Sequence, residues 1–210
     1  MRTIIPKERR RKRWSWCGYY EKTARGIAWD TLREALRLFE AKSSERRERF
    51  AIDLGCGSGR DTFELLWRGW KVLAIDNQPT AIRWIRSNVR TKYRSRLRTR
   101  VASFERTSLP KCDLVNASRS IPFCTPEHFG PLWRKIVTSI RPSGRFSGHF
   151  FGPNDEWASL SDMTFHSRRQ VEFLLRHFKI ESFHEKEWEG ETSSGRKKHW
   201  HVFSVVARKL

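Results

Sequence analysis

The hydrophobic pattern of the chain alternates between short, mostly apolar runs and longer segments with apolar residues three and four positions apart. The short runs predict buried strands, and the spaced pattern predicts amphipathic helices. We expect strands over residues 50–54, 71–75, 97–103, 112–116, 145–151, 179–188 and 199–207. We expect helices over residues 29–39 (with Asp30 as N-cap), 60–68, 79–89, 126–140 and 167–178, and polar turns at 141–144 and 190–197.

Strands and helices alternate along most of the chain, which is typical of a parallel sheet covered by helices on both faces. The last two strands follow each other through a short turn, so they should pair as an antiparallel hairpin at one edge. The expected fold class is therefore α/β, with seven mostly parallel strands and a C-terminal antiparallel hairpin. A length of 210 residues suits one domain. We place it over residues 16–210, after a basic arm at 1–15 that we expect to be flexible.

A glycine-rich loop, Gly55-Cys-Gly-Ser-Gly59, follows the first expected strand. Its glycines let the backbone turn sharply and approach a ligand closely. In open α/β sheets, ligands bind at this carboxyl edge of the strands. On its own, the loop also suits a nicotinamide dinucleotide, or a plain turn flanked by two helix-capping acids.

Two acids narrow the choice of ligand. Asp53 precedes the loop, where a carboxylate repels phosphates but pairs with an ammonium group. Asp76 ends the next strand, 21 residues beyond Gly55, where an acid accepts the hydroxyls of an adenosine ribose. The last glycine of a G-x-G-x-x-G dinucleotide pattern is replaced by Arg60. These residues describe S-adenosylmethionine (SAM) better than a dinucleotide.

The segments 51–62 and 72–76 resemble the first two motifs of the class I SAM-dependent methyltransferases. The likeness extends from about residue 19 to the C-terminus, and within the class the chain is most similar, though loosely, to the bacterial tellurite-resistance branch. The resemblance implies a Rossmann-like fold with SAM as cofactor. It also implies which residues contact each part of SAM. The methionine end would contact Asp53, Gly55, Cys56, Gly57 and Gly59, and the ribose would contact Asp76 and Asn77. The adenine would lie beside Ser103 and Phe104, and the sulfonium region would face Asn116.

The charge of the chain raises a second kind of partner. A formal net charge of +20 comes from 43 Lys and Arg against 23 Asp and Glu, and a field of this sign attracts polyanions such as nucleic acids. The segment 83–106 holds nine of these cations and one acid. Because it offers few aromatic residues for stacking on bases, we interpret it as a solvated face.

Cysteine usage and hydropathy indicate the compartment. The four cysteines show neither a disulfide framework nor a C-x-x-C spacing. No apolar run reaches the ~18 residues that cross a bilayer, and the first residues lack the apolar core of a signal peptide. We therefore expect a cytoplasmic protein without a membrane partner.

Candidates for the acceptor chemistry are fewer, because methyl transfer from a sulfonium depends mainly on alignment. We expect Asn116, Ser118 and Phe123 to line the acceptor pocket. Tyr20, beside Tyr19, is a candidate lid residue, and His149 is a candidate base. His199 and His201 share one face of a strand, but no nearby acid or cysteine completes a zinc site, so no metal is expected.

Three functions fit these observations. The first is a methyltransferase acting on a small molecule. The second is a methyltransferase acting on RNA or another nucleic acid, which the charge favours. It is opposed by segment 116–123, which begins with Asn but lacks the rest of an N-P-P-Y type motif. The third is a SAM-binding module without turnover. The oligomeric state is not indicated.

Overall fold

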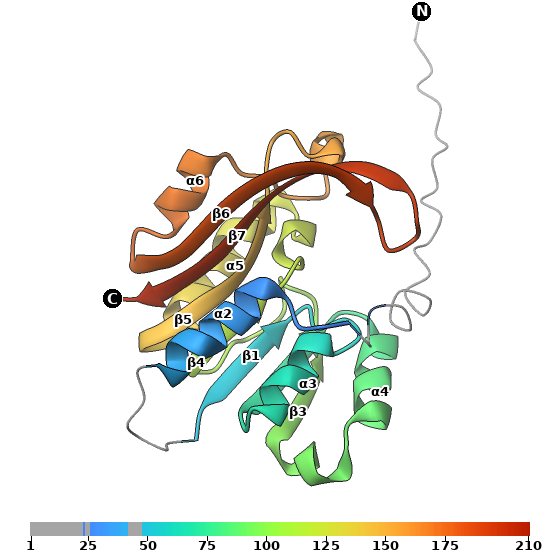
Figure 1. Cartoon of the computed structure of the whole chain (residues 1–210), viewed down its shortest axis with the longest axis vertical. Coiled ribbons are helices and arrows are strands. Elements are labelled where there is room, and N and C mark those ends of the chain that lie inside the picture. The colour runs from blue at the N-terminus through green and yellow to red at the C-terminus, as the bar shows by residue number, and fades with distance from the viewer. Residues whose placement is uncertain (1–22, 24–25, 42–47) are drawn as a thin grey trace, which may run out of the picture.

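The computed structural model describes residues 23, 26–41 and 48–210. It contains one sheet of seven strands in the order β3-β2-β1-β4-β5-β7-β6, seen in Figure 1. The strands are β1 (Phe50–Leu54), β2 (Lys71–Asp76), β3 (Leu97–Val101), β4 (Cys112–Ala117), β5 (Ile140–Phe151), β6 (Phe178–Glu191) and β7 (Lys197–Lys209). The basic arm 1–15 and Tyr20 lie outside the described residues.

Strand pairing confirms the expected fold class. The pairs among β1, β2, β3, β4 and β5 are parallel. β7 runs antiparallel to both β5 and β6 and forms the C-terminal hairpin with β6. The strand order reverses between β1 and β4, which makes their carboxyl ends the switch point of the sheet.

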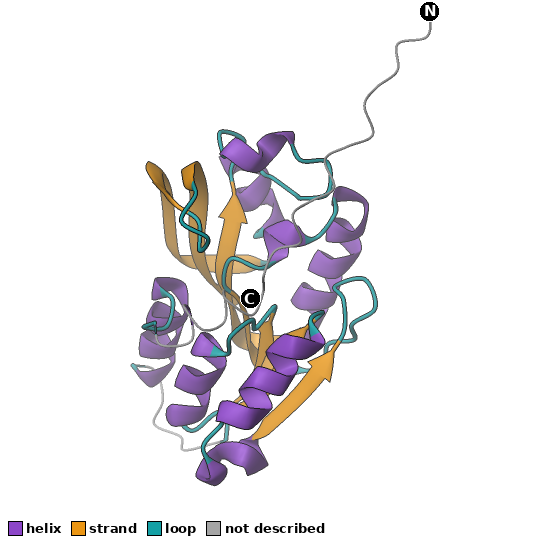
Figure 2. Cartoon of the chain, turned by 90° about the vertical axis from the view of Figure 1, so that its right-hand side faces the viewer, coloured by secondary structure: helices purple, strands orange, loops and turns teal. Residues whose placement is uncertain are grey.

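Helices cover both faces of the sheet (Figure 2). They are α2 (Asp30–Glu40), α3 (Arg60–Trp67), α4 (Pro79–Asn88), α5 (Pro126–Ser139) and α6 (Arg168–Leu174). The apolar sides of α2 and α3 pack on strand residues such as Ala51 and Val72, and α4 packs on Ala74 of the same face. The opposite face, which includes Ile52, packs on α5 and α6. Alternate residues of β1 therefore serve two separate cores.

The described residues also include three short 3-10 helices: η1 (Thr91–Arg96), η2 (Ile121–Phe123) and η3 (Glu156–Ser159). The sequence pattern did not predict η1. No helix among the described residues is both long and apolar enough to cross a bilayer.

Two local expectations were wrong. The polar turn at 141–144 is part of β5, which begins at Ile140. Ser143 there takes a left-handed φ of 63°, and the β4–β5 register shifts between Cys112 and Leu114, so turn-forming residues produce an irregular strand rather than a break. Asp30 is the first residue of α2 instead of its N-cap, which is Trp29.

The two strands of the C-terminal hairpin are longer than the hydrophobic pattern predicted, because polar residues at the tip of the hairpin still form strand pairs.

Helix α6 is shorter than expected. It begins at a capping box, in which the Ser167 hydroxyl accepts from Gln170 N and the Gln170 side chain accepts from Ser167 N. Such reciprocal bonds satisfy two backbone donors of the first turn.

Candidate functional site

The carboxyl ends of β1 and β4 bring two predicted site residues together. Asp53 and Asn116 are register partners in the parallel pair. Asn116 Nδ2 donates to Asp53 Oδ1 at 3.0 Å, and both side chains are buried. This is the switch point at which doubly wound sheets bind their ligands.

Asn116 is the centre of a wider polar cluster. Its Nδ2 also donates to Asp61 Oδ2 of α3, at 2.9 Å. Its Oδ1 accepts from the hydroxyls of Ser147, at 2.8 Å, and Ser118, at 3.2 Å. Both donors and both lone pairs of the amide are thereby used. Asn116 consequently holds β1, β4, β5 and α3 in one arrangement.

The cluster carries an excess of negative charge. Burial and the charge of Asp61 raise the pKa of Asp53 to about 7, although hydrogen bonds from Thr62 and Asn116 act in the opposite direction. Thr62 Oγ1 donates to Asp53 Oδ2 at 2.5 Å. Asp61 has a long ion pair with Arg60, 3.9 Å between Oδ1 and Nε. A cationic group of a ligand would relieve the repulsion between the two buried carboxylates.

The glycine loop adopts a backbone that only glycine takes readily. Gly55, Gly57 and Gly59 have φ values of 75°, 51° and 81°, in the left-handed region. A Cβ at Gly55 would lie 2.4 Å from Ser120 Cβ. The loop therefore passes close to the segment after β4, and side chains on these residues would push the two apart.

Asp76 joins the loop to the end of β2. Its Oδ2 accepts from Gly57 N at 2.9 Å, and its Oδ1 accepts from Gln78 N at 2.8 Å. Burial raises its pKa. Each carboxylate oxygen keeps a second lone pair, so Asp76 can still accept two hydroxyl groups. Asn77 beside it is exposed.

The residues after β3 lie beside Asp76. Ala102 N donates to Asp76 O at 3.0 Å, which places the following Ser103 and Phe104 next to the end of β2. Both are half-buried, and Phe104 packs against the larger core. The structure thus brings the two predicted adenine neighbours to the same edge as the predicted ribose acid.

An aromatic and cationic group covers the polar cluster. Trp29 N donates to Asp61 Oδ1 at 3.0 Å. The Trp29 ring contacts the guanidinium groups of Arg60 and Arg119, at 4.2 and 4.3 Å from its centroid. Arg119 has a left-handed φ of 50° and also lies over the ring of Trp200, at 4.9 Å. These contacts place positive charge next to the acids.

His149 is fully buried, and both of its ring nitrogens face polar partners. Arg119 N donates to Nδ1 at 3.3 Å, so we assign the proton to Nε2, which lies 3.4 Å from Asp30 Oδ1. Burial lowers the pKa of His149, and the contact with His149 lowers the pKa of Asp30 to about 2. Burial thus favours the neutral imidazole, and the Nδ1 lone pair is occupied by the hydrogen bond from Arg119 N.

The remaining predicted residues are dispersed. Cys56 is buried, which raises the pKa of its thiol well above the ordinary value, so it is not a thiolate nucleophile. Phe123 is 42% exposed and lies 6.4 and 6.2 Å from the rings of Phe151 and Trp157. Tyr20 falls outside the part of the chain that the structure describes.

The reasoning about the two hairpin histidines was wrong in one respect, because acids do lie nearby. Strand pairing places β6 carboxylates opposite them: His199 Nδ1 is 2.7 Å from Glu189 Oε1 and its Nε2 is 3.2 Å from Glu187 Oε2, while His201 Nε2 is 3.1 Å from Glu185 Oε1. Cross-strand neighbours cannot be read from spacing along one strand. Within the described ranges, no group of three such side chains could hold a metal ion.

Sequence reasoning missed Asp61, Thr62, Trp29 and Arg119 as site residues. Asp61 and Thr62 stand on the buried side of α3 together with Leu65 and Leu66. Their helical spacing was a usable signal, since polar residues on an apolar face require partners. Trp29 and Arg119 carry no such signal, because their contacts depend on how the chain folds over the loop.

Comparisons with known proteins agree with this geometry. A family model described as a methyltransferase domain matches residues 51–144, which include the glycine loop, Asp76 and Asn116. The match covers somewhat less than half of the chain and identifies this part of it as a methyltransferase domain. The chain is a methyltransferase, and SAM is its cofactor. No curated protein sequence matches the chain.

Solved structures share the fold of this methyltransferase. TehB from Haemophilus influenzae is similar with a TM-score of 0.69 and 15% identity, over 84% of this chain and 62% of its own, so the chain spans less than two thirds of TehB. A SAM-dependent methyltransferase from Methanosarcina mazei is similar with a TM-score of 0.63 and 19% identity, over 88% and 99% of the two chains. The Burkholderia thailandensis 1,6-didemethyltoxoflavin-N1-methyltransferase, solved with bound substrate and S-adenosylhomocysteine, is similar with a TM-score of 0.60 and 20% identity, over 86% and 79%. At these identities the likeness concerns the fold, and the tellurite-resistance branch stays a prediction.

The residues present fit the cofactor of this methyltransferase. The excess negative charge around Asp53 and Asp61 suits the ammonium and sulfonium charges of SAM. The free lone pairs of Asp76 suit a ribose diol. The left-handed loop between them packs closely against the protein, because a Cβ at Gly55 would meet Ser120 and one at Gly59 would meet Ile85.

Proposed function

We propose that this chain transfers the methyl group of SAM to a small-molecule acceptor at the carboxyl ends of β1 and β4. The observation that carries the proposal is the buried polar cluster of Asp53, Asp61 and Asn116, with Asp76 at the next strand end. When bound, SAM supplies an activated methyl group on a sulfonium. The protein has then to hold the acceptor in line with that group and exclude water.

Each predicted cofactor contact has a proposed role. Asp53 and the loop residues Gly55, Cys56, Gly57 and Gly59 hold the methionine end. Asp76 and Asn77 bind the ribose, and Ser103 and Phe104 flank the adenine. Asn116 lies at the sulfonium region. Because all of its own polar atoms are engaged, its main role there is to orient Asp53 and Asp61.

The acceptor is proposed to bind between the end of β4 and the Trp29–Arg119 cover. Ser118 and Phe123 line this side, and Phe123 presents an exposed aromatic ring. His149 positions Arg119 instead of removing a proton, because its Nδ1 lone pair already accepts from Arg119 N, while its Nε2 lies near Asp30 of α2. An acceptor that is already nucleophilic, such as an amine, suits a site of this kind.

Binding of SAM tests the cofactor half of the proposal. Isothermal titration calorimetry with Asp76→Ala should show no measurable SAM affinity, because the ribose loses its acceptor and the glycine loop loses its hydrogen bond. Glu127→Ala, which removes an exposed acid at the start of α5, is the control and should bind as the wild type does. Unchanged affinity in Asp76→Ala would overturn the ribose assignment.

The acceptor half is tested with methyl-labelled SAM and a cell extract separated into small molecules, RNA and protein. We expect label in the small-molecule fraction, and no transfer by Asp76→Ala. Label confined to RNA would favour the second function, and SAM binding with no transfer to any fraction would favour a binding module without turnover.

A further inference from the structure

The edge of the sheet at β3 concentrates positive charge that the methyl-transfer site does not use. Eight cations occur along α4, η1 and β3 without an intervening acid. All except the half-buried Arg100 are exposed. We name these residues the β3-edge surface: Arg83, Arg86, Arg90, Lys92, Arg94, Arg96, Arg98 and Arg100.

None of these eight cations forms an ion pair with an acid that the structure describes. Cations elsewhere are often paired, such as Arg68 with Glu40 at 2.6 Å, Arg145 with Glu181 at 2.6 Å and Arg168 with Glu185 at 3.0 Å. The hydrogen bonds within the surface are to neutral groups: Arg86 Nε donates to Thr99 Oγ1 at 2.7 Å, and Arg100 donates to Ser108 O at 2.5 Å. The charge of the surface is therefore available to a partner.

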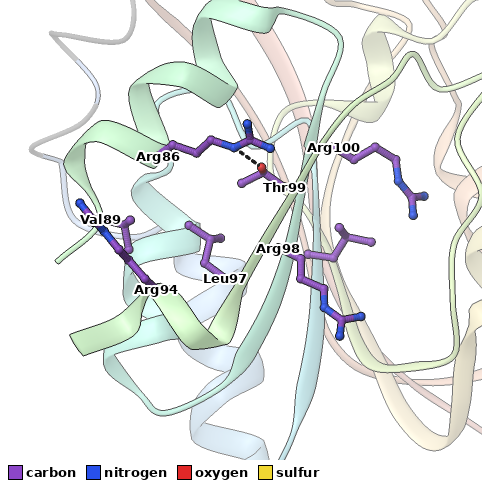
Figure 3. A pocket seen from close by; sticks show the side chains of 8 residues that line it. Arg86, Val89, Arg94, Leu97, Arg98, Thr99 and Arg100 are labelled. Carbon is purple, nitrogen blue, oxygen red and sulfur yellow. Dashed lines mark hydrogen bonds between the residues drawn. The ribbon is translucent and has the colours of Figure 1, made fainter. Parts of the chain in front are cut away.

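An open hollow of about 700 Å³ lies at the sheet edge beside this surface. Figure 3 shows Arg86, Arg94, Val89 and Leu97 on one side of β3, and Arg98 and Arg100 pointing away from the opposite side of the strand. The lining residues are Leu73, Arg86, Val89, Arg94, Leu97, Arg98, Thr99 and Arg100. Successive residues of a strand point to opposite faces of the sheet, so Arg98 and Arg100 lie on the other face from Arg86 and Arg94. The four guanidinium groups therefore flank the sheet edge on both sides.

Protection of an edge strand explains only part of this pattern. Charged side chains on an edge strand prevent pairing with another sheet, and Arg98 and Arg100 of β3 would meet that need. Arg83 and Arg86 lie on α4, and Arg94 lies in η1, where no strand edge is exposed. Seven of the eight cations are Arg, whose planar guanidinium binds phosphate oxygens in pairs.

We propose that the β3-edge surface binds the phosphate backbone of single-stranded nucleic acid. Two half-buried aromatic residues, Trp84 and Tyr93, lie among the cations and provide faces on which a base can stack. Positive charge on both sides of a sheet edge suits a flexible strand that can wrap around the edge better than the flat headgroup plane of a membrane.

This surface acts as a docking site and is distinct from the site of methyl transfer. β3 is three strands away from β4, about 14 Å at the usual strand spacing, so the cations of this surface are not among the groups around Asn116. The proposal concerns binding, and it holds whichever acceptor receives the methyl group.

The test compares two triple variants of equal charge by fluorescence anisotropy with a labelled oligouridylate of roughly 20 nucleotides, longer than a typical single-strand site. The first is Arg94→Ala/Arg98→Ala/Arg100→Ala. The second, Arg134→Ala/Arg169→Ala/Arg176→Ala, removes three exposed arginines of α5, α6 and the segment after α6. Each titration is repeated from about 50 to 300 mM salt, because phosphate contacts appear as a salt-dependent slope.

We expect the β3-edge triple to weaken binding by about tenfold or more and to reduce the salt slope by about 2, from ~0.7 per lost contact. The α5–α6 triple should change affinity by less than about threefold. SAM affinity, measured by calorimetry, should stay unchanged in both, which separates this proposal from the proposed function.

Equal weakening by both triples would show that the charge acts diffusely and would overturn the proposal. Absence of salt-dependent binding by the wild type would overturn it as well. A third outcome would also overturn the proposal. The wild type would bind vesicles with anionic lipid more tightly than the oligouridylate, and the β3-edge triple would abolish this vesicle binding, so the surface would serve a membrane.

Discussion

Asn116 shows how much a single side chain decides at this site. Its amide separates two buried carboxylates and uses every polar atom it has. A hydrophobic residue of similar size would leave Asp53 and Asp61 facing each other with fewer donors. The position therefore serves stability and ligand charge together.

Replacing Asn116 by Ala should reduce the free energy of unfolding by about 2–3 kcal/mol, because buried acceptors and hydroxyls lose their partner. Urea denaturation measures this. Asn88→Ala is the control, since Asn88 is exposed on α4 and bonds only to Trp84 O among the described residues; its effect should stay within about 0.5 kcal/mol. A loss of similar size in both variants would contradict the role of the cluster.

The raised pKa of Asp53 predicts a pH dependence of SAM affinity. The ionised carboxylate attracts a cationic ligand and the protonated one does not, so affinity should rise as the pH passes through about 7, by up to about tenfold per pH unit below it. Its stability contribution has the opposite trend. The folded pKa exceeds the ~3.9 of unfolded Asp, so that contribution is largest below about pH 4 and declines as the pH rises to 7.

Calorimetry of SAM binding from about pH 5.5 to 8 tests this dependence against the isosteric Asp53→Asn. The variant should bind more weakly above pH 7 and lose most of the slope. Asp61, Asp76 and Arg60 face the same cluster and remain in both proteins. A slope that persists in Asp53→Asn would assign the titration to one of them.

At the scale of elements, the turn from β1 to α3 depends on conformation and contact at the same glycine. Gly55 combines a left-handed φ of 75° with a near contact to Ser120. Gly195, in the turn between β6 and β7, has a similar φ of 81°, but no atom lies within 4 Å of where its Cβ would be. A comparison of Gly55 with Gly195 therefore separates the free-energy cost of backbone strain from that of a steric clash.

Gly55→Ala should therefore lower the free energy of unfolding by about 3 kcal/mol or more, from strain and clash together. Gly195→Ala should lower it by about 1–2 kcal/mol, from strain alone. Thermal or urea unfolding of both variants gives the comparison. Equal losses would show that Ser120 moves aside at little cost.

At the scale of the whole molecule, the C-terminal hairpin is tied to the rest of the fold by ion pairs between distant residues. Lys198 of β7 forms a short, fully buried ion pair with Asp155 of the segment after β5, and its Nζ also lies 3.7 Å from the ring centroid of Trp200. Arg145 and Glu181 connect β5 to β6 in the same way. These pairs fix the hairpin to β5 and to the segment that follows it.

Lys198→Met should reduce the free energy of unfolding by about 3–5 kcal/mol, because Asp155 is left as a buried charge without its partner. Lys197→Met, at the exposed neighbouring position, is the control and should have little effect. The double variant Lys198→Met/Asp155→Leu should recover most of the loss in urea denaturation. If it does not, packing around Lys198 matters more than its charge.

The sequence by itself determined the class of fold and the chemistry of the cofactor site. The spacing and the length of the apolar runs indicate where helices and strands lie, because they show which side of each segment is buried. Asp53, the glycines and Asp76 lie within one β1–loop–α3–β2 unit, so their proximity follows from short-range geometry.

Only the tertiary structure decided which polar groups meet around that unit. Asn116 reaches Asp53 and Asp61 across 63 and 55 residues, and Arg119 N reaches His149 across 30. Strand register, a left-handed residue and the path of a loop determine such contacts, and none of these leaves a periodic pattern in the sequence. For the same reason, only the packing of α4, η1 and β3 side by side gathers the exposed cations of segment 83–100 at one edge of the sheet.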